Sequence, residues 1–384
     1  MEKTQQATLS HSSFQCPDTS PSPSVPSSVE FVKVADVKVV AALGDSLTTA
    51  VGANATSLLQ LPIEYRDLSW SIGGYGTLKD VSTLPNIMKV FNPNLVGASS
   101  GTTFHSLRAP IEKTGFNLAT NGHRTYQLPS QARTLIDTLS SSKDLNFKED
   151  WKLLTIFIGL NDICNYCKDK TKYSVDNFIH HFTVSLEMLK KEVPRMIVNV
   201  VQIGTIQPLR EVKLSAGCFL QLSFCSCLLQ PTSKSPELQE LVKVNEEYQR
   251  RLEELLHGSR FFKEDFAVVL QPFLKHTDAP RLPNGKIDLT FFAPDCFHFS
   301  MKGQKSLARG LWNNMFQPAG KKTMLRKLSD PISLICPPAE HPYIDTRPMI
   351  IKQAKLQQSR GVSPMTSTSM LLLFHTAVAY FLFI

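Results

Sequence analysis

The feature that most constrains the fold is an alternation of short apolar runs with longer amphipathic segments. Runs suited to buried parallel strands occur at Asp36–Leu43, Leu153–Ile158, Met196–Ile203 and Phe266–Leu270. Helical patterns fall between and after them, at Gln131–Leu139, Val175–Lys191, Pro236–His257 and Lys302–Phe316. Strands that alternate with helices imply a parallel sheet covered on both faces. We therefore expect an α/β fold.

The clearest helix of the sequence is Pro236–His257. Its apolar side chains recur along one stripe, as a helix that packs against a core requires. Ser235 is suited to the N-cap, Pro236 to the first helical position, and Gly258 to the position just past the end. These signals predict both ends of the helix.

Two short strings carry the chemistry. Gly-Asp-Ser-Leu at 44–47 follows the first apolar run, and Asp-Cys-Phe-His at 295–298 precedes the last helix. Ser46 and His298 are 252 positions apart, so only a folded domain brings them together. A hydroxyl becomes a good nucleophile when a base takes its proton, and a third group orients that base. We expect Ser46 as nucleophile, His298 as base and Asp295 as the orienting carboxylate of a serine hydrolase.

Two further carboxylates lie next to residues of the predicted site. Asp45 lies beside the nucleophile, but adjacent side chains rarely converge on one point, so we expect it to cap the turn. Asp162 is a weaker candidate than Asp295 for orienting the imidazole.

An oxyanion needs donors besides the Ser46 N–H group. The segment 117–122 ends in Gly122, whose bare backbone can approach a substrate closely. The segment 159–162 follows an apolar run directly and carries Asn161. Each segment alone is typical of an ordinary turn. Their positions after strand-like runs favour an oxyanion hole of Ser46, Gly122 and Asn161.

These four blocks, in this order, resemble the SGNH/GDSL hydrolase family. More narrowly, the chain resembles a single repeat of membrane-associated phospholipase B. The narrower similarity covers about residues 14–345, and the strings that carry it lie at 68–74, 83–87, 91–93, 161–167 and 295–300.

The resemblance implies a three-layer α/β/α sandwich with a central parallel sheet and a carboxylic ester hydrolase of the phospholipase and lysophospholipase type. It implies the roles given above for Ser46, His298, Asp295, Gly122 and Asn161, without a metal or cofactor. Implied substrates are glycerophospholipids at both acyl positions, lysophospholipids and retinyl esters, met at a membrane or micelle surface. The implied location is the cell surface, at the apical plasma membrane.

The sequence departs from the family pattern at two site positions. Leu160 stands where the family repeat has glycine, and His123 follows Gly122 where a small residue is usual. Two alternatives therefore stay open. One alternative is a catalytically silent repeat that binds lipid or packs against other repeats. The other is an esterase for small soluble esters.

Eight cysteines cluster locally, which favours disulfides and an oxidising compartment. They are Cys16, Cys164, Cys167, Cys218, Cys225, Cys227, Cys296 and Cys336. Their pairing cannot be deduced, and a zinc site is the weaker alternative because only one good ligand pair is present. Asn54 begins the one glycosylation sequon.

The N-terminal sequence conflicts with the oxidising compartment that the cysteines suggest. The first 30 residues are polar and contain no apolar stretch of the kind that a signal peptide needs. Either the chain is a piece or variant of a longer precursor, or its cysteines stay reduced in the cytosol, and we favour the first.

The composition divides the chain into four parts. We expect a flexible Pro/Ser-rich segment at 1–30, the hydrolase domain at 31–345, a basic stalk at 346–369 and an apolar tail at 370–384. The tail is short for a membrane span, so it is a marginal anchor, a GPI-attachment signal or a splice-derived end. Residues 319–384 hold +5 of the net charge of +8. The nearly balanced body argues against nucleic-acid binding.

Overall fold

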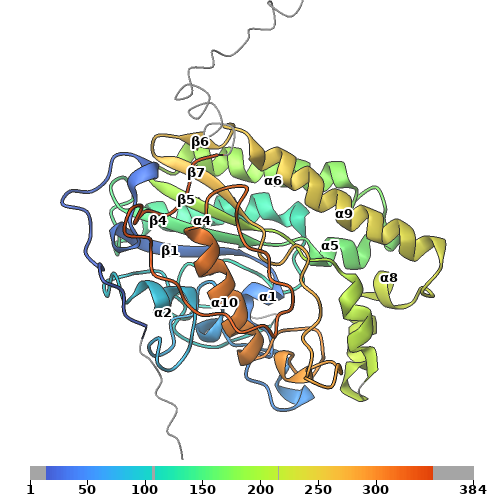
Figure 1. Cartoon of the computed structure of the whole chain (residues 1–384). Coiled ribbons are helices and arrows are strands. Elements are labelled where there is room, and N and C mark those ends of the chain that lie inside the picture. Colours follow the sequence, from blue (N-terminus) through green and yellow to red (C-terminus); the bar gives the residue numbers. More distant parts are fainter. Residues whose placement is uncertain (1–13, 106–108, 215, 349–384) are drawn as a thin grey trace, which may run out of the picture.

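A central five-stranded sheet organises the molecule, with the strand order β1-β4-β5-β7-β6 (Figure 1). The computed structural model describes residues 14–105, 109–214 and 216–348. The strands are β1 (Val37–Gly44), β4 (Trp151–Phe157), β5 (Met196–Val201), β6 (Phe262–Lys263) and β7 (Phe266–Gln271). All neighbours pair in parallel except β6, which runs antiparallel to β7 at the edge. A separate antiparallel pair is formed by β2 (Ile63–Glu64) and β3 (Thr103–Phe104).

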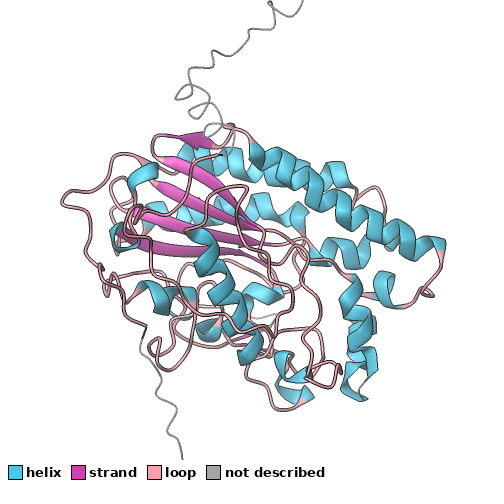
Figure 2. Cartoon of the chain, viewed as in Figure 1, coloured by secondary structure: helices cyan, strands magenta, loops and turns pink. Residues whose placement is uncertain are grey.

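Helices cover both faces of the sheet, which gives the expected three-layer α/β/α sandwich (Figure 2). On one face α4 (Leu128–Ser141), α6 (Val175–Glu192) and α9 (Pro236–His257) pack side by side. On the other face α10 (Met301–Met315) packs beside α2 (Leu84–Met88). The short α-helices are α1 (Ser46–Thr49), α3 (Ile111–Thr114), α5 (Leu160–Asn165), α7 (Gln221–Phe224) and α8 (Ser226–Leu229).

Segments of 3-10 helix connect these elements. They are η1 (Val29–Phe31), η2 (Val34–Asp36), η3 (Leu58–Gln60), η4 (Arg66–Leu68), η5 (Thr125–Gln127), η6 (Tyr166–Lys168), η7 (Gln207–Leu214), η8 (Ala216–Leu220) and η9 (Leu289–Phe291).

The four predicted strands and four predicted helices are all present, with ends shifted by a few residues at most. Every residue of β4 and β5 is buried, as expected for apolar runs enclosed between two helical layers. The predicted bounds of α9 are confirmed, and the Ser235 hydroxyl caps its start by accepting a 3.2 Å hydrogen bond from Leu238 N–H. The carboxyl ends of the parallel strands meet at one edge of the sheet, where α/β folds bind their ligands.

The prediction of a flexible N-terminal segment is wrong for residues 14–30. A disulfide joins Cys16 to Cys336, and the indole N–H of Trp151 donates to the carbonyl of Pro26 at 2.9 Å. A Pro- and Ser-rich composition therefore does not prevent order here, because a covalent link and a buried aromatic donor hold the segment against the domain.

The domain also continues slightly past the predicted boundary at 345. The Thr346 hydroxyl donates to the carbonyl of Val29 at 3.1 Å, and the side chain of Pro348 is buried. The expected apolar tail, the remainder of the stalk and residues 1–13 lie outside the described residues. Among the described ranges, no helix combines the length and apolar character that crossing a bilayer requires.

Leu311 anchors α10 in the core and is fully buried. Leu311→Ala should lower the free energy of unfolding by about 2–5 kcal/mol, because the substitution removes apolar contacts and leaves a cavity. Urea unfolding followed by tryptophan fluorescence measures this loss. Lys305→Ala, at an exposed position of the same helix, is the control and should change stability by no more than about 0.5 kcal/mol. Equal effects of the two substitutions would contradict the packing of α10.

Candidate active site

The turn at the end of β1 presents Ser46. Gly44 is required there because an added Cβ would lie 2.5 Å from the Phe157 carbonyl oxygen and 2.6 Å from the Thr48 hydroxyl. Asp45 is the N-cap of α1, and its carboxylate accepts a 3.0 Å hydrogen bond from Leu47 N–H. The expectation that Asp45 caps the turn is confirmed. Ser46 thus begins a one-turn helix at the carboxyl edge of the sheet.

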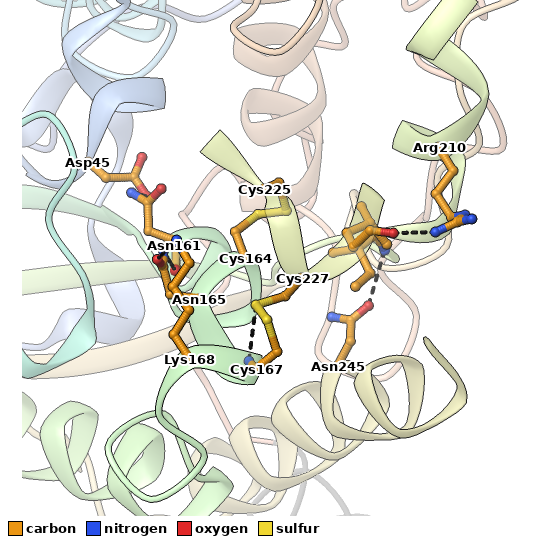
Figure 3. The surroundings of a disulfide bond; sticks show 12 residues. Asp45, Asn161, Cys164, Asn165, Cys167, Lys168, Arg210, Cys225, Cys227 and Asn245 are labelled. Carbon is orange, nitrogen blue, oxygen red and sulfur yellow. Dashed lines mark hydrogen bonds between the residues drawn. A yellow bond between two sulfur atoms is a disulfide. The ribbon is translucent and has the colours of Figure 1, made fainter. Parts of the chain in front are cut away.

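Asn161 lies beside this turn. It is the second residue of α5, which begins just after β4 ends. Its amide nitrogen donates to the carbonyl of His123 at 2.9 Å and lies 3.4 Å from the other carboxylate oxygen of Asp45 (Figure 3). The turn at the end of β1 and the start of α5 therefore lie side by side.

The segment that contains Gly122 runs parallel to the end of β1. Leu118 N–H donates to the Ala42 carbonyl at 2.9 Å, and Thr120 N–H donates to the Gly44 carbonyl at 3.2 Å. Gly122 follows in a left-handed conformation (φ +75°) and is exposed, with nothing within 4 Å of the position of an added Cβ. The backbone conformation, rather than lack of space, favours glycine at this position.

Gln131 ties this segment to the turn. Its side-chain amide makes two hydrogen bonds with Gly44, at 2.9 Å to the N–H group and 2.8 Å to the carbonyl. The same side chain lies 2.8 Å from Nδ1 of His123. The imidazole that departs from the family pattern is therefore held by Gln131, and burial lowers its pKa.

Asp295 and His298 form a buried pair in the loop between η9 and α10. The distance between His298 Nδ1 and Asp295 Oδ2 is 2.6 Å. The other carboxylate oxygen accepts 3.0 Å hydrogen bonds from the N–H groups of Phe297 and His298. Burial raises the pKa of the Asp295 carboxyl, but the His298 ring and the two N–H donors outweigh it and hold the pKa below its usual value. Asp295 therefore stays ionised beside the imidazole.

The two halves of the site are joined by the start of α10. Trp70 donates through its backbone N–H to the Gln304 side chain at 3.0 Å and through its indole N–H to the Leu47 carbonyl at 3.2 Å. Trp70 therefore connects the turn of Ser46 to α10, which begins three residues after His298.

Asp162 has a different role from the one considered in the sequence. Its carboxylate accepts hydrogen bonds from the backbone N–H of Thr125 at 3.0 Å and from the Thr125 hydroxyl at 2.5 Å. Burial raises the pKa of Asp162 to about 6. The carboxylate therefore fixes the start of η5, while Asp295 is the partner of His298.

An apolar cavity opens beside the site. Leu47, Leu160 and Phe297, the neighbours of Ser46, Asn161 and His298, lie in its wall. The rest of the lining is largely aliphatic and aromatic, and it includes Phe157, Ile203, Pro208, Leu209, Val212, Leu274, Phe292, Phe299 and Leu328. Leu160, the second departure from the family pattern, therefore contributes to this wall.

Sequence reasoning left the disulfide pairing open, and the structure pairs all eight cysteines. The bonds are Cys16–Cys336, Cys164–Cys225, Cys167–Cys227 and Cys218–Cys296. The zinc alternative is wrong, because every cysteine is bonded to another cysteine. Asn54, the sequon residue, is exposed. Among the described residues no cluster of His, Cys, Asp and Glu could hold a metal ion.

The element that the sequence did not predict comprises the described residues 207–214 and 216–229, which we call the cap. Cys218–Cys296 links it to the loop of Asp295 and His298. Two more bonds link it to Cys164 in α5 and to Cys167 in η6 (Figure 3). Its sequence signals are Cys218 and the close pair Cys225 and Cys227, which give no partners.

Comparison with known proteins identifies the family. The profile of the GDSL-like lipase/acylhydrolase family matches residues 40–311, a span that holds Ser46, Gly122, Asn161, Asp295 and His298. The chain belongs to the GDSL-like lipase/acylhydrolase family. It is therefore a carboxylic ester hydrolase by family.

Three relatives share a larger part of the chain. Membrane-associated phospholipase B1 of Mus musculus is 42% identical over 342 residues, and that of Homo sapiens is 41% identical over 340. The protein of the same name from Rattus norvegicus is 39% identical over 340 residues. Each match covers 87% of this chain but 23% of the relative, so the chain spans about a quarter of those proteins.

Asp45 gives the fold a measurable pH dependence. Burial raises its pKa from 3.8 to about 7. Between these values the native state holds a proton that the unfolded state has lost, so the free energy of unfolding falls as pH rises from 4 to 7. The Asn side chain of Asp45→Asn does not titrate. Relative to this variant, the free energy of unfolding of the wild type should fall by about 1.4 kcal/mol per pH unit in this window. Urea unfolding at several pH values measures the difference.

Asp80→Asn is the control for that experiment. Asp80 is a surface carboxyl, and hydrogen bonds from Thr77 lower its pKa. Its contribution to stability should therefore be lost as pH falls, which is the opposite sign. The difference in free energy of unfolding between the wild type and Asp45→Asn should therefore change across pH 4 to 7. A constant difference would contradict the burial of the Asp45 carboxyl.

Proposed function

We propose that the protein is a serine esterase that hydrolyses acyl esters of glycerophospholipids and lysophospholipids. The observation that carries the proposal is the buried Asp295–His298 hydrogen bond of 2.6 Å. Leu47 and Phe297, the neighbours of Ser46 and His298, line one apolar cavity, which supports a shared site. The 42% identity to a membrane-associated phospholipase B1 supports the lipid substrate.

The hydrogen bond sets the tautomer of His298. A carboxylate only accepts hydrogen bonds, so Nδ1 carries the proton and Nε2 offers its lone pair. In the proposed reaction Ser46 Oγ attacks the ester carbonyl carbon while its proton passes to Nε2. The C–O bond to the glyceryl alcohol then breaks, and the alcohol leaves with that proton. Water, deprotonated by the same nitrogen, hydrolyses the acyl-enzyme and releases the fatty acid.

Three donors are proposed for the oxyanion of the tetrahedral intermediate. They are the backbone N–H groups of Ser46 and Gly122 and the side-chain amide of Asn161. One N–H of the Asn161 amide is used by the His123 carbonyl at 2.9 Å, which orients the side chain. The second points toward Asp45 over a longer 3.4 Å contact that an oxyanion would displace at little cost.

The disulfides support an oxidising compartment for this activity. Cytosolic proteins seldom keep four structural disulfides, whereas secreted and cell-surface proteins often do. Together with the membrane association named for the relatives, this favours action at the outer face of a membrane.

Ser46→Ala tests the nucleophile. The variant should lose essentially all hydrolysis of a diacyl phospholipid while it unfolds at the same urea concentration as the wild type. The double variant Ser46→Ala/His298→Ala should be no slower than either single variant, because the two side chains act as one unit. Product analysis by thin-layer chromatography measures the rate.

A fluorophosphonate probe checks the same residue without a substrate. The wild type should be labelled at Ser46, and Ser46→Ala should not be labelled. A folded wild type that stays unlabelled would favour the alternative of a silent, lipid-binding repeat.

Leu209→Trp tests whether the cavity holds the acyl chain. The added ring should fill the cavity, so that long acyl groups lose contacts worth about 0.8 kcal/mol per methylene. The kcat/KM for long-chain esters should fall at least about tenfold, and that for acetyl esters should change little. Rates over a series of p-nitrophenyl esters measure the profile. Val184→Trp, at an exposed position of α6, is the control. A parallel loss for all chain lengths would contradict the assignment.

A further inference from the structure

The cap is held in place by covalent bonds at both halves of the site. Cys218 is bonded to Cys296, which lies between Asp295 and His298 in the sequence. Further along the cap, Cys225 and Cys227 are bonded to the two cysteines at 164 and 167, near Asn161 (Figure 3). A segment of short helical turns has little stability of its own, so these bonds determine where it lies.

The cap presents apolar side chains to solvent. Phe219 is 59% exposed, and Leu222 and Phe224 are each 36% exposed. The sequence from 216 to 229 contains no Asp, Glu, Lys, Arg or His. Clustered apolar side chains on a surface are typical of an interaction site. Because disulfides fix the cap, these side chains cannot move into the core to escape water.

One of these exposed side chains lies beside the site. The Phe224 ring lies 5.6 Å from the His298 ring and 5.5 Å from the Phe297 ring. On its inner side the cap contributes Pro208, Leu209 and Val212 to the wall of the apolar cavity. One segment therefore offers an apolar outer surface and an apolar inner surface beside the same imidazole.

We infer that the cap is the surface by which the enzyme binds an aggregated, electrically neutral lipid, such as a phosphatidylcholine bilayer. This inference rests on the proposed function, because it takes the bound lipid to be the source of the ester. The absence of charge from 216 to 229 fits a zwitterionic surface better than an anionic one. A protein partner docked on Phe224 would obstruct the approach to His298, whereas a lipid surface delivers its acyl chains there.

Vesicle binding tests the inference. Phosphatidylcholine vesicles are sedimented with protein in the Ser46→Ala background, so that no lipid is hydrolysed during the measurement. The double substitution Phe219→Asp/Leu222→Asp should lower the partition coefficient at least about tenfold, because two apolar side chains no longer insert. With Ser46 restored, the double variant should lose activity on micellar substrate and keep its rate on a monomeric short-chain ester.

Phe31→Asp is the matched control. Phe31 is 52% exposed, but it lies in η1, before β1 begins and at the opposite end of the sheet from the cap (Figure 1). This variant should bind vesicles as the parent does. The inference is overturned if the cap variant binds vesicles as well as the parent does, or if Phe31→Asp loses binding equally.

Sedimentation velocity without lipid tests whether the cap is instead an interface between protein molecules. A dimer that forms with the parent cap and disappears in the cap variant, with vesicle binding unchanged, would make the cap a protein interface and overturn the inference. Vesicle binding is measured without turnover, so its outcome is separate from that of the Ser46→Ala activity test. A failure of the proposed function would appear only in the latter.

Discussion

The arrangement of the site depends on the space available at one residue, Gly44. The carbonyl of Phe157 on the neighbouring strand and the side chain of Thr48 leave no room for a Cβ. The tight fit lets β1 turn directly into α1, so that Ser46 emerges at the strand end. Gln131 fixes the same residue through both its N–H and its carbonyl. Asp45 then connects the turn to Asn161, and the remaining parts assemble around it.

Local environment separates the three carboxylates of this region by function. Asp295 accepts hydrogen bonds on both oxygens and stays ionised beside His298. Asp45 and Asp162 are as deeply buried, but burial raises the pKa of each. Their oxygens hold backbone N–H groups and polar side chains in position. A carboxylate that orients a base must keep its charge, whereas one that fixes a turn can lose it at modest cost.

The sequence predicted what depends on local pattern. Apolar runs and helical stripes located the strands and long helices. The four motif blocks predicted Ser46, Gly122, Asn161, Asp295 and His298 as site residues. It did not predict the order of residues 14–30, because their anchors, Cys336 and Trp151, lie far along the chain. The cap was missed for the same reason. The three cysteines at 218, 225 and 227 indicate covalent constraints but not their partners. Apolar residues without a helical or strand period also predict no helix or strand.

The bond between Cys16 and Cys336 joins residues that are 320 positions apart, near the two ends of the described domain in the sequence. A pulling force applied to the chain outside this pair would pass through the sulfur atoms. The sheet and the site enclosed between them would carry no tension. In a series of such units, each joined to the next by a flexible connector, stretching would lengthen the connectors and leave every hydrolase unit folded.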